Sequence, residues 1–304
     1  YDKDAFKSLL LPDMKESVLC SSLRILSELL EKHHGQKVIL LIDEYDVPLA
    51  KAYENGYYDE MILLIRNLFG NVLKTNDSLA FAVLTGCLRI AKESIFTGLN
   101  NFKVYSITDD EFDETFGFTN KEVMEMLQYY GLSDRFDEVK EWYDGYRFGN
   151  ADVYCAWDVV NYCRDHCKNP NAELKNYWMN TSGNEIINHF VDSLNQPGML
   201  AKRELERLVN GETVVKRVDE MITYKELYTS IDNLWSTMFM TGYLTQHGKE
   251  GDGYYRLAIP NREIRNIIIE RINCFAEKFL KIVRCSEIFI LHCKMRMRQW
   301  LKRF

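Results

Sequence analysis

An apolar run that ends in two acids limits the folds open to this chain more than any other feature of its sequence. Residues 38–42 read Val-Ile-Leu-Leu-Ile, and Asp43 and Glu44 follow directly. A short run that is apolar at every position predicts a strand that is buried on both faces. Such a strand would bring two carboxylates to one edge of a sheet. Acids that simply return the chain to the surface after a buried strand are a common alternative.

The same pattern resembles the Walker B motif of nucleoside triphosphatases. Phosphoryl transfer to water requires Mg²⁺ near the phosphates and a group that orients or deprotonates the attacking water. Asp43 would hold Mg²⁺ through water, and Glu44 would polarise the nucleophile. The phosphate loop G-x-x-x-x-G-K-[ST] does not occur in the sequence, so the pattern represents half of an ATP site. On pattern alone, the catalytic and the surface-acid interpretations stand equal.

A second apolar run, residues 79–84, ends at Thr85. Apolar residues recur at helical spacing beside both runs, over residues 14–32 and 57–74. Strands that are apolar on both faces and alternate with helices predict a parallel sheet that is covered on both sides. Ligands bind outside the carboxyl ends of such strands. We therefore expect Thr85 at the same sheet edge as Asp43, where its hydroxyl would orient the attacking water.

Two further polar residues near these strands allow more than one interpretation. Arg89 would face a γ-phosphate of its own or of a neighbouring site, although a solvated helix residue is the simpler interpretation. Asp46 adds a third acid, and the three acids together would suit a nuclease-like metal site. We expect instead that Asp46 and Pro48 start the next helical segment, through capping and a fixed φ angle.

The pattern changes beyond Phe118. A weaker strand is expected just before it, over residues 103–107, and helices are expected over residues 120–142, 156–167, 183–194 and 199–210. Residues 143–150, which are rich in Tyr, Asp and Gly, are expected to form a loop between helices. A helix, a hairpin with a glycine-rich turn and a second helix follow, over residues 231–243, 244–259 and 262–273. This order suggests a winged-helix-like unit.

We therefore predict an α/β fold in which a partial parallel sheet of a P-loop NTPase precedes a helical region and a winged-helix-like segment. The predicted boundaries are 1–118 for the C-terminal part of a nucleotide-binding core, 119–223 for the helical region, 224–273 for the winged-helix-like segment and 274–304 for a divergent basic tail. For the tail, a frameshifted end and a genuine basic helix both remain open.

Composition limits the classes of partner. A net charge of −7 argues against broad electrostatic binding to nucleic acid or to an anionic membrane. No apolar run approaches the roughly 20 residues that cross a bilayer. Eight cysteines are scattered without the framework of a small secreted domain, which favours a cytoplasmic protein with reduced thiols. Cys20 and Cys87 are expected in the core.

Five blocks of the chain, in order, resemble the bacterial AAA-ATPase-like proteins. These blocks are residues 41–49, 84–96, 142–149, 177–184 and 259–265, within a likeness that runs from about residue 1 to residue 273. By this resemblance Asp43 and Glu44 match the Walker B acids, Thr85 and Gly86 match the strand-end motif, and Arg89 lies in a matching block. The resemblance implies ATP and Mg²⁺ as ligands.

The resemblance also implies a larger parent protein. The phosphate loop of the family lies upstream of residue 1, and a PD-(D/E)XK nuclease-like domain often follows where this chain diverges. We expect an ATPase in the intact parent and a fragment that binds nucleotide poorly. A nucleotide-gated switch or binding module with little turnover is the alternative. DNA binding by residues 224–273 has weak support, and neither a partner beyond nucleotide nor an oligomeric state can be named.

Overall fold

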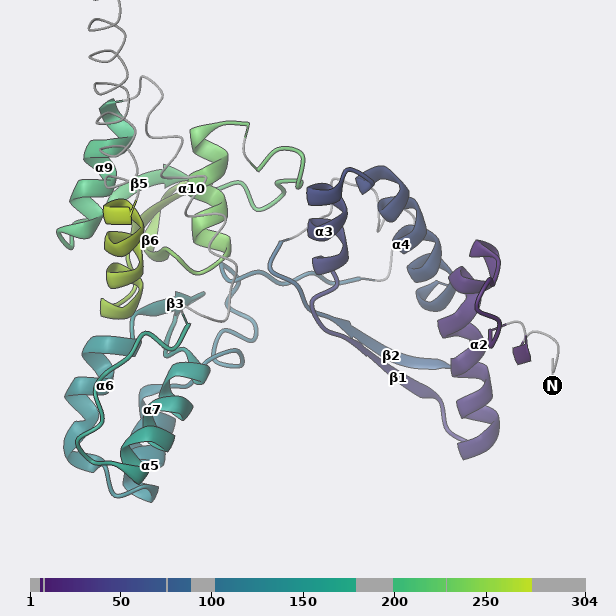
Figure 1. Cartoon of the computed structure of the whole chain (residues 1–304), viewed down its shortest axis with the longest axis horizontal. Coiled ribbons are helices and arrows are strands. Elements are labelled where there is room, and N and C mark those ends of the chain that lie inside the picture. The colour runs from purple at the N-terminus through teal and green to yellow at the C-terminus, as the bar shows by residue number, and fades with distance from the viewer. Residues whose placement is uncertain are drawn as a thin grey trace, which may run out of the picture. The chain divides into compact units, whose positions relative to one another are not determined.

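The computed structural model describes residues 6–7, 9–74, 76–88, 102–178, 199–227 and 229–274. The chain forms two compact units (Figure 1). Unit 1 comprises Tyr1–Thr108 and Arg217–Thr241, and unit 2 comprises Asp109–Lys216 and Gly242–Phe304. These units differ from the predicted boundaries at 118 and 223, because the chain returns to unit 1 at Arg217.

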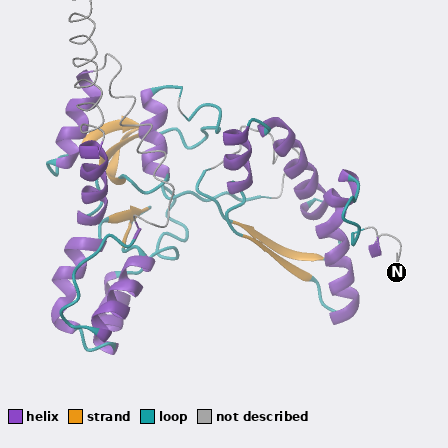
Figure 2. Cartoon of the chain, viewed as in Figure 1, coloured by secondary structure: helices purple, strands orange, loops and turns teal. Residues whose placement is uncertain are grey.

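Unit 1 begins with helices and strands in alternation (Figure 2). Its elements are α2 (Glu16–His34), β1 (Val38–Ile42), α3 (Val47–Asn55), α4 (Tyr58–Leu73), β2 (Leu79–Leu84) and, after the return of the chain, α10 (Ile231–Met240). The helices and strands predicted for residues 14–84 are confirmed, to within a few residues at their ends. Gly35 ends α2 in the left-handed conformation at φ 68°, where glycine lacks the steric penalty of a Cβ atom.

The two strands of unit 1 are parallel, as predicted. Ile42 lies opposite Leu84, and the register shifts once, near the start of β1. Both residues pack against a core cluster that lies mainly on α3, α4 and the returning segment. The prediction of a sheet covered on both sides is wrong for the described residues, since Ile39 and Leu41 on the other face are 62% and 72% exposed.

The core of unit 1 joins distant parts of the sequence. Its buried members are Leu49, Tyr58, Ile62, Ile65, Phe69, Leu88, Ile222 and Leu227. Ile222 and Leu227 belong to the returning segment, so residues 217–241 complete this core. Two sequence expectations fail in unit 1: residues 103–107 form no strand, and Cys87 is exposed whereas Cys20 is buried.

Unit 2 contains helices and two small sheets. Its elements are α5 (Asn120–Tyr129), the 3₁₀ helix η1 (Ser133–Arg135), α6 (Phe136–Tyr143), β3 (Tyr146–Phe148), β4 (Ala151–Val153), α7 (Ala156–Lys168), α9 (Met199–Val209), β5 (Val214–Arg217), β6 (Thr245–Gly251), β7 (Tyr254–Ala258) and a helix over residues 262–274. The strands pair as β3–β4 and as β5–β7–β6. Residues 183–194, where a helix was predicted, lie outside the described residues.

Two parts of unit 2 differ from the sequence expectation. The single helix predicted over residues 120–142 is broken, because Gly131 adopts a left-handed conformation at φ 70° before η1 begins. Residues 143–150, predicted as a loop, contain β3 and lead into β4. Three-residue strands carry too little periodicity to be recognised in a sequence.

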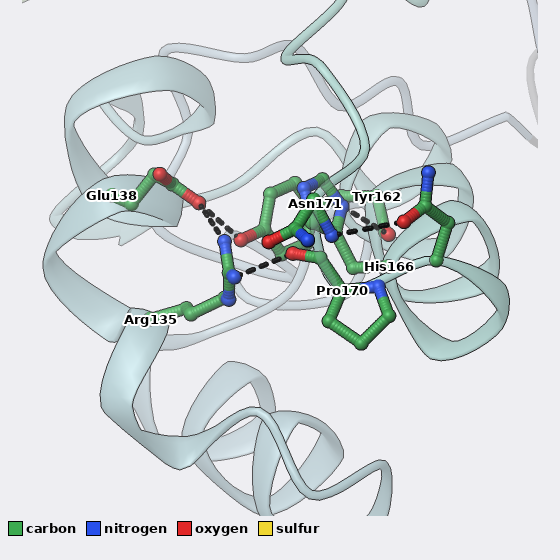
Figure 3. A network of polar contacts seen from close by, with 7 residues as sticks. Arg135, Glu138, Tyr162, His166, Pro170 and Asn171 are labelled. Carbon is green, nitrogen blue, oxygen red and sulfur yellow. Dashed lines mark hydrogen bonds and ion pairs between the residues drawn. The ribbon is translucent and has the colours of Figure 1, made fainter.

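The helices of unit 2 enclose a core with a polar rim. Its buried members are Val123, Leu127, Leu132, Val139, Tyr143, Tyr154, Val159, Tyr162 and Cys163. Figure 3 shows the rim: Arg135 binds Glu138 at 3.2 Å and donates to the Pro170 carbonyl at 2.6 Å. Tyr162 donates to Glu138, and its ring stacks on His166. These contacts tie α6, α7 and the 169–171 turn together.

The order of helix, hairpin and helix predicted near the C-terminal end is confirmed. β6 and β7 pair antiparallel, and the helix over residues 262–274 follows. The preceding helix α10 groups with unit 1, whereas the hairpin groups with unit 2. The elements of a winged helix are therefore present in sequence order, and a winged-helix arrangement is not shown.

Candidate functional site

The carboxyl ends of β1 and β2 bring the predicted polar residues together in unit 1. The Thr85 N–H donates to the Ile42 carbonyl at 2.9 Å, and the Tyr45 N–H donates to the Thr85 carbonyl at 2.9 Å. These bonds extend the parallel ladder one step beyond both strands. As a result Asp43, Glu44 and Thr85 occupy one sheet edge, as their positions in the sequence predict.

The side chains at this edge are bonded to one another. The Thr85 hydroxyl donates to Asp43 Oδ1, which also accepts the Glu44 N–H at 3.0 Å. The same Glu44 N–H lies 3.4 Å from Thr85 Oγ1. Asp43 and Glu44 are exposed. One carboxylate is therefore held in place by two donors and still faces solvent, and a second carboxylate lies next to it.

The backbone at Glu44 is strained. Its φ angle is 52°, and among the described residues only Phe112 shares a positive φ without being glycine. A residue with a side chain pays about 1–2 kcal/mol for this left-handed conformation. The conformation turns the Glu44 N–H towards Asp43 and Thr85, so the strained backbone allows the contacts between the two strand ends. Strained backbone of this kind concentrates at functional sites.

Asp46 has a structural role that the sequence did not indicate. It is the N-cap residue of α3, as predicted, but its side chain makes no capping bond to that helix. Its carboxylate is 2% exposed and accepts the Leu88 N–H at 3.0 Å and the Tyr224 hydroxyl at 3.2 Å. Within the described residues no group of three acids, histidines or cysteines could hold a metal. The nuclease-like interpretation of the three acids is therefore unsupported.

The loop over residues 85–88 fits closely between Tyr45 and Asp46. A Cβ atom added to Gly86 would lie 2.7 Å from Asp46 Oδ1 and 2.7 Å from the Tyr45 ring. The Tyr45 hydroxyl donates to the Leu88 carbonyl at 2.9 Å. Only glycine leaves room for this approach. The residues that directly follow Glu44 thus fix the loop that carries Thr85.

The electrostatic potential at this edge is negative. Cys87 is exposed as a whole residue, but loss of water around its sulfur, and then the charges of Asp46, Glu44 and Asp43, raise the pKa of its thiol to about 11. A concentration of carboxylates that disfavours a thiolate favours a cation. Two exposed carboxylates and a hydroxyl are oxygen ligands of the kind that hydrated Mg²⁺ accepts. The residues present therefore fit such an ion, while Arg89 lies outside the described residues.

A second cluster of acids lies in unit 2, and no spacing of acids along the chain predicts it. Asp158 and Glu263 stand in the first turns of α7 and of the 262–274 helix, and they are 2% and 0% exposed. Glu263 Oε1 accepts the Trp178 N–H at 2.7 Å. Burial, and then the charge of Asp158, raise the pKa of Glu263 to about 9, and burial also raises the pKa of Asp158. Asp158 Oδ1 and Glu263 Oε2 are buried and have no hydrogen-bond partner in the described part of the chain, and one proton held between the two carboxyl groups would satisfy both atoms.

Three of the five sequence blocks that resemble the AAA-ATPase-like proteins meet near this acid pair. Trp178 and Glu263 come from two of them. The third contributes Gly145, whose φ of 104° allows it to lie against the Pro260 carbonyl, and Trp142, whose ring faces Arg262 at 4.9 Å. The blocks are far apart in the sequence, so spacing could not reveal their contact. The signal that could have found it is the density of aromatic residues and glycine in each block.

Unit 1 is a mixed α/β arrangement of helices and a small parallel sheet, and in folds of this class ligands bind outside the carboxyl ends of the strands. Residues 3–96, which include this edge, match the model of the AAA-ATPase-like family, whose description is "Predicted AAA-ATPase". The chain is also similar to an uncharacterised protein encoded in the vnfD 5′ region of Azotobacter chroococcum mcd 1. The two are 26% identical over 262 residues, which is 81% of this chain and 45% of that relative.

No solved structure matches this chain at a significant level. Among the helices of the described residues, none has the length and apolar character that crossing a bilayer requires.

Proposed function

We propose that the edge formed by Asp43, Glu44 and Thr85 is part of an ATP-hydrolysing site, completed by parts of a larger protein. The observation that carries the proposal is the hydrogen bond from Thr85 to Asp43 at the ends of two parallel strands. The family match over residues 3–96 supports ATP as the nucleotide. This chain spans less than half of the relative to which it is similar, so the activity of a whole protein is itself part of the proposal.

Each residue has a defined task in this proposal. Asp43 would hold Mg²⁺, and the bonds from Thr85 and the Glu44 N–H fix the orientation of its carboxylate. The ion would supply neutralisation of the charge on the phosphates. The Glu44 carboxylate is exposed beside Asp43, and it accepts the proton of the attacking water. Arg89 stays a candidate for contact with the γ-phosphate.

The dependence of ATP hydrolysis on Mg²⁺ tests the role of Asp43. In the full-length protein that contains this chain, Asp43→Asn should raise the Mg²⁺ concentration needed for half-maximal hydrolysis at least tenfold, because one charge of the site is lost. Asp77→Asn is the matched control, since Asp77 lies before β2 at the opposite end of the strand. Equal Mg²⁺ dependence in the two variants would contradict the assignment of Asp43.

A nucleotide-gated switch with little turnover is the second candidate. The bond between Asp46 and Tyr224 favours it, because it connects the loop beside the site to a segment 178 residues further along the chain. Glu44→Gln separates the two functions if the variant still binds ATP. If the protein acts as a hydrolase, the variant loses its biological effect together with phosphate release. If it acts as a switch, the variant keeps its biological effect.

A further inference from the structure

Asp46 is a buried carboxylate held entirely by neutral donors among the described residues. Its Oδ2 atom accepts both the Leu88 N–H, at 3.0 Å, and the Tyr224 hydroxyl, at 3.2 Å. Ion pairs of Asp46 are absent from the described part of the chain. A buried charge without a cation depends on its hydrogen bonds, so the loss of either donor leaves it poorly solvated.

One of these donors belongs to the loop that carries Thr85. Leu88 is buried in the core of unit 1, and its N–H lies three residues after Thr85. Gly86 has no space for a side chain beside Asp46. Because Asp46 also follows Glu44 by two residues, a shift of Asp46 would move both halves of the strand-end site. The buried carboxylate therefore joins the segment that follows Glu44 to the loop that follows Thr85.

The other donor anchors the returning segment. The Tyr224 ring lies 6.2 Å from the Tyr58 ring, and its neighbours Ile222 and Leu227 are in the core. Lys225 adds an ion pair to Asp59 at 2.6 Å. Burial, and then the Asp46 charge, raise the pKa of Tyr224, so its hydroxyl remains a donor throughout the physiological range. This segment connects two parts of unit 2 along the chain, at residues 216–217 and 241–242.

We propose that Asp46 is a positioning residue for the strand-end site and that Tyr224 links this position to the 217–241 segment. The inference rests on the proposed ATPase function. Changes in the 85–88 loop during turnover must then strain or break the Asp46–Tyr224 bond. The movement of the loop is then transmitted to the 217–241 segment, and both ends of this segment continue along the chain into unit 2. The site and the segment are coupled through one carboxylate.

Hydrogen exchange tests the link on this chain. Tyr224→Phe removes one hydroxyl and keeps the ring that packs on Tyr58, and Tyr57→Phe is the control, since Tyr57 is exposed beside the same helix. We expect amide exchange of the peptide covering Leu88 to become at least tenfold faster in Tyr224→Phe and to stay unchanged in the control. Equal exchange in both variants would overturn the link.

Kinetics in the full-length protein test the positioning role. We expect Tyr224→Phe to lower kcat for ATP at least fivefold while KM stays within twofold, because the ligand edge itself is intact. Asp46→Asn, which keeps an acceptor oxygen, should retain more activity than Asp46→Ala. The double variant Asp46→Asn with Tyr224→Phe should lose less than the product of the single losses, because both remove the same bond.

The two proposals fail in different ways. A wild-type protein that hydrolyses no ATP overturns the ATPase function and the positioning role, and the exchange of the Leu88 peptide then decides the link alone. A wild-type protein that hydrolyses ATP, with unchanged kcat in Tyr224→Phe, overturns the positioning role and leaves the ATPase function standing. An increase in KM alone would also overturn it, since that result assigns Tyr224 to ligand binding.

Discussion

Replacing Glu263 by Gln should remove a pH dependence that the buried acid pair imposes on unit 2. We expect Glu263 to keep its proton in the wild-type protein and to donate it to Asp158, because burial, and then the charge of Asp158, raise its pKa to about 9. Glutamine reproduces this state, since its amide N–H donates to Asp158 while its oxygen accepts the Trp178 N–H. The substitution keeps the hydrogen bonds and removes the titration.

The size of the effect follows from the linkage between proton binding and folding. The unfolded chain releases the Glu263 proton near the ordinary pKa of 4.5, whereas the folded pair keeps it up to about pH 9. Between these values the folded state binds one more proton, so its free energy of unfolding falls by about 1.4 kcal/mol per pH unit. The contribution is complete below pH 4.5 and is lost as the pH rises towards 9. From pH 6 to pH 8 the loss is about 3 kcal/mol.

Urea unfolding at pH 6, 7 and 8 measures this loss. Fluorescence suits the assay, because Trp142, Trp157 and Trp178 all belong to unit 2. Between pH 6 and pH 8, we expect the free energy of unfolding of the wild type to fall by about 3 kcal/mol more than that of Glu263→Gln. Glu125→Gln, which alters an exposed acid of the same unit, should follow the wild type. Parallel pH profiles for the wild type and Glu263→Gln would refute a shared proton in the folded protein.

Three further predictions concern close contacts and the thiol of unit 1. Gly86→Ala should lower the free energy of unfolding by about 1–3 kcal/mol in thermal melts, because its Cβ has no space, whereas Gly70→Ala on an open helix face should not lower it. Gly145→Ala should reduce the yield of folded unit 2 in limited proteolysis, since its Cβ would overlap the Pro260 carbonyl. At pH 7.5, Cys87 should react with iodoacetamide at least tenfold more slowly than Cys274, which is also exposed. Peptide mass spectrometry measures both reaction rates. Addition of Mg²⁺ should bring the two rates closer together. Equal reaction rates for the two thiols would contradict the negative potential at the strand ends.

The sequence predicts the elements of unit 1 well where apolar periodicity is strong. The run over residues 38–42 and the run over residues 79–84 are strands because each is uniformly apolar, and their polar ends meet because parallel strands point the same way. The run over residues 103–107 mixes charge with apolar residues and does not pair. Coverage of the sheet could not be predicted, because it depends on neighbours rather than on the strand itself.

The parts that escaped prediction depend on contacts between distant residues. Asp46 reads as a helix cap, and its bonds to Leu88 and Tyr224 become visible only when the returning segment is folded onto α3 and α4. The left-handed backbone of Glu44 has no signature in a residue type that normally avoids it. The Asp158–Glu263 pair lies between two helices more than 100 residues apart in the chain.

Phosphate release from ATP by Glu44→Gln tests whether the Glu44 carboxylate takes the proton from the attacking water. In the full-length protein with saturating Mg²⁺ and ATP, we expect this variant to release phosphate at least a hundredfold more slowly than the wild type and to bind ATP equally well, because only the group that takes the proton from water is lost. Glu60→Gln, an exposed acid at the start of α4, should behave as the wild type. Wild-type rates of phosphate release in Glu44→Gln would contradict the role of Glu44 in hydrolysis.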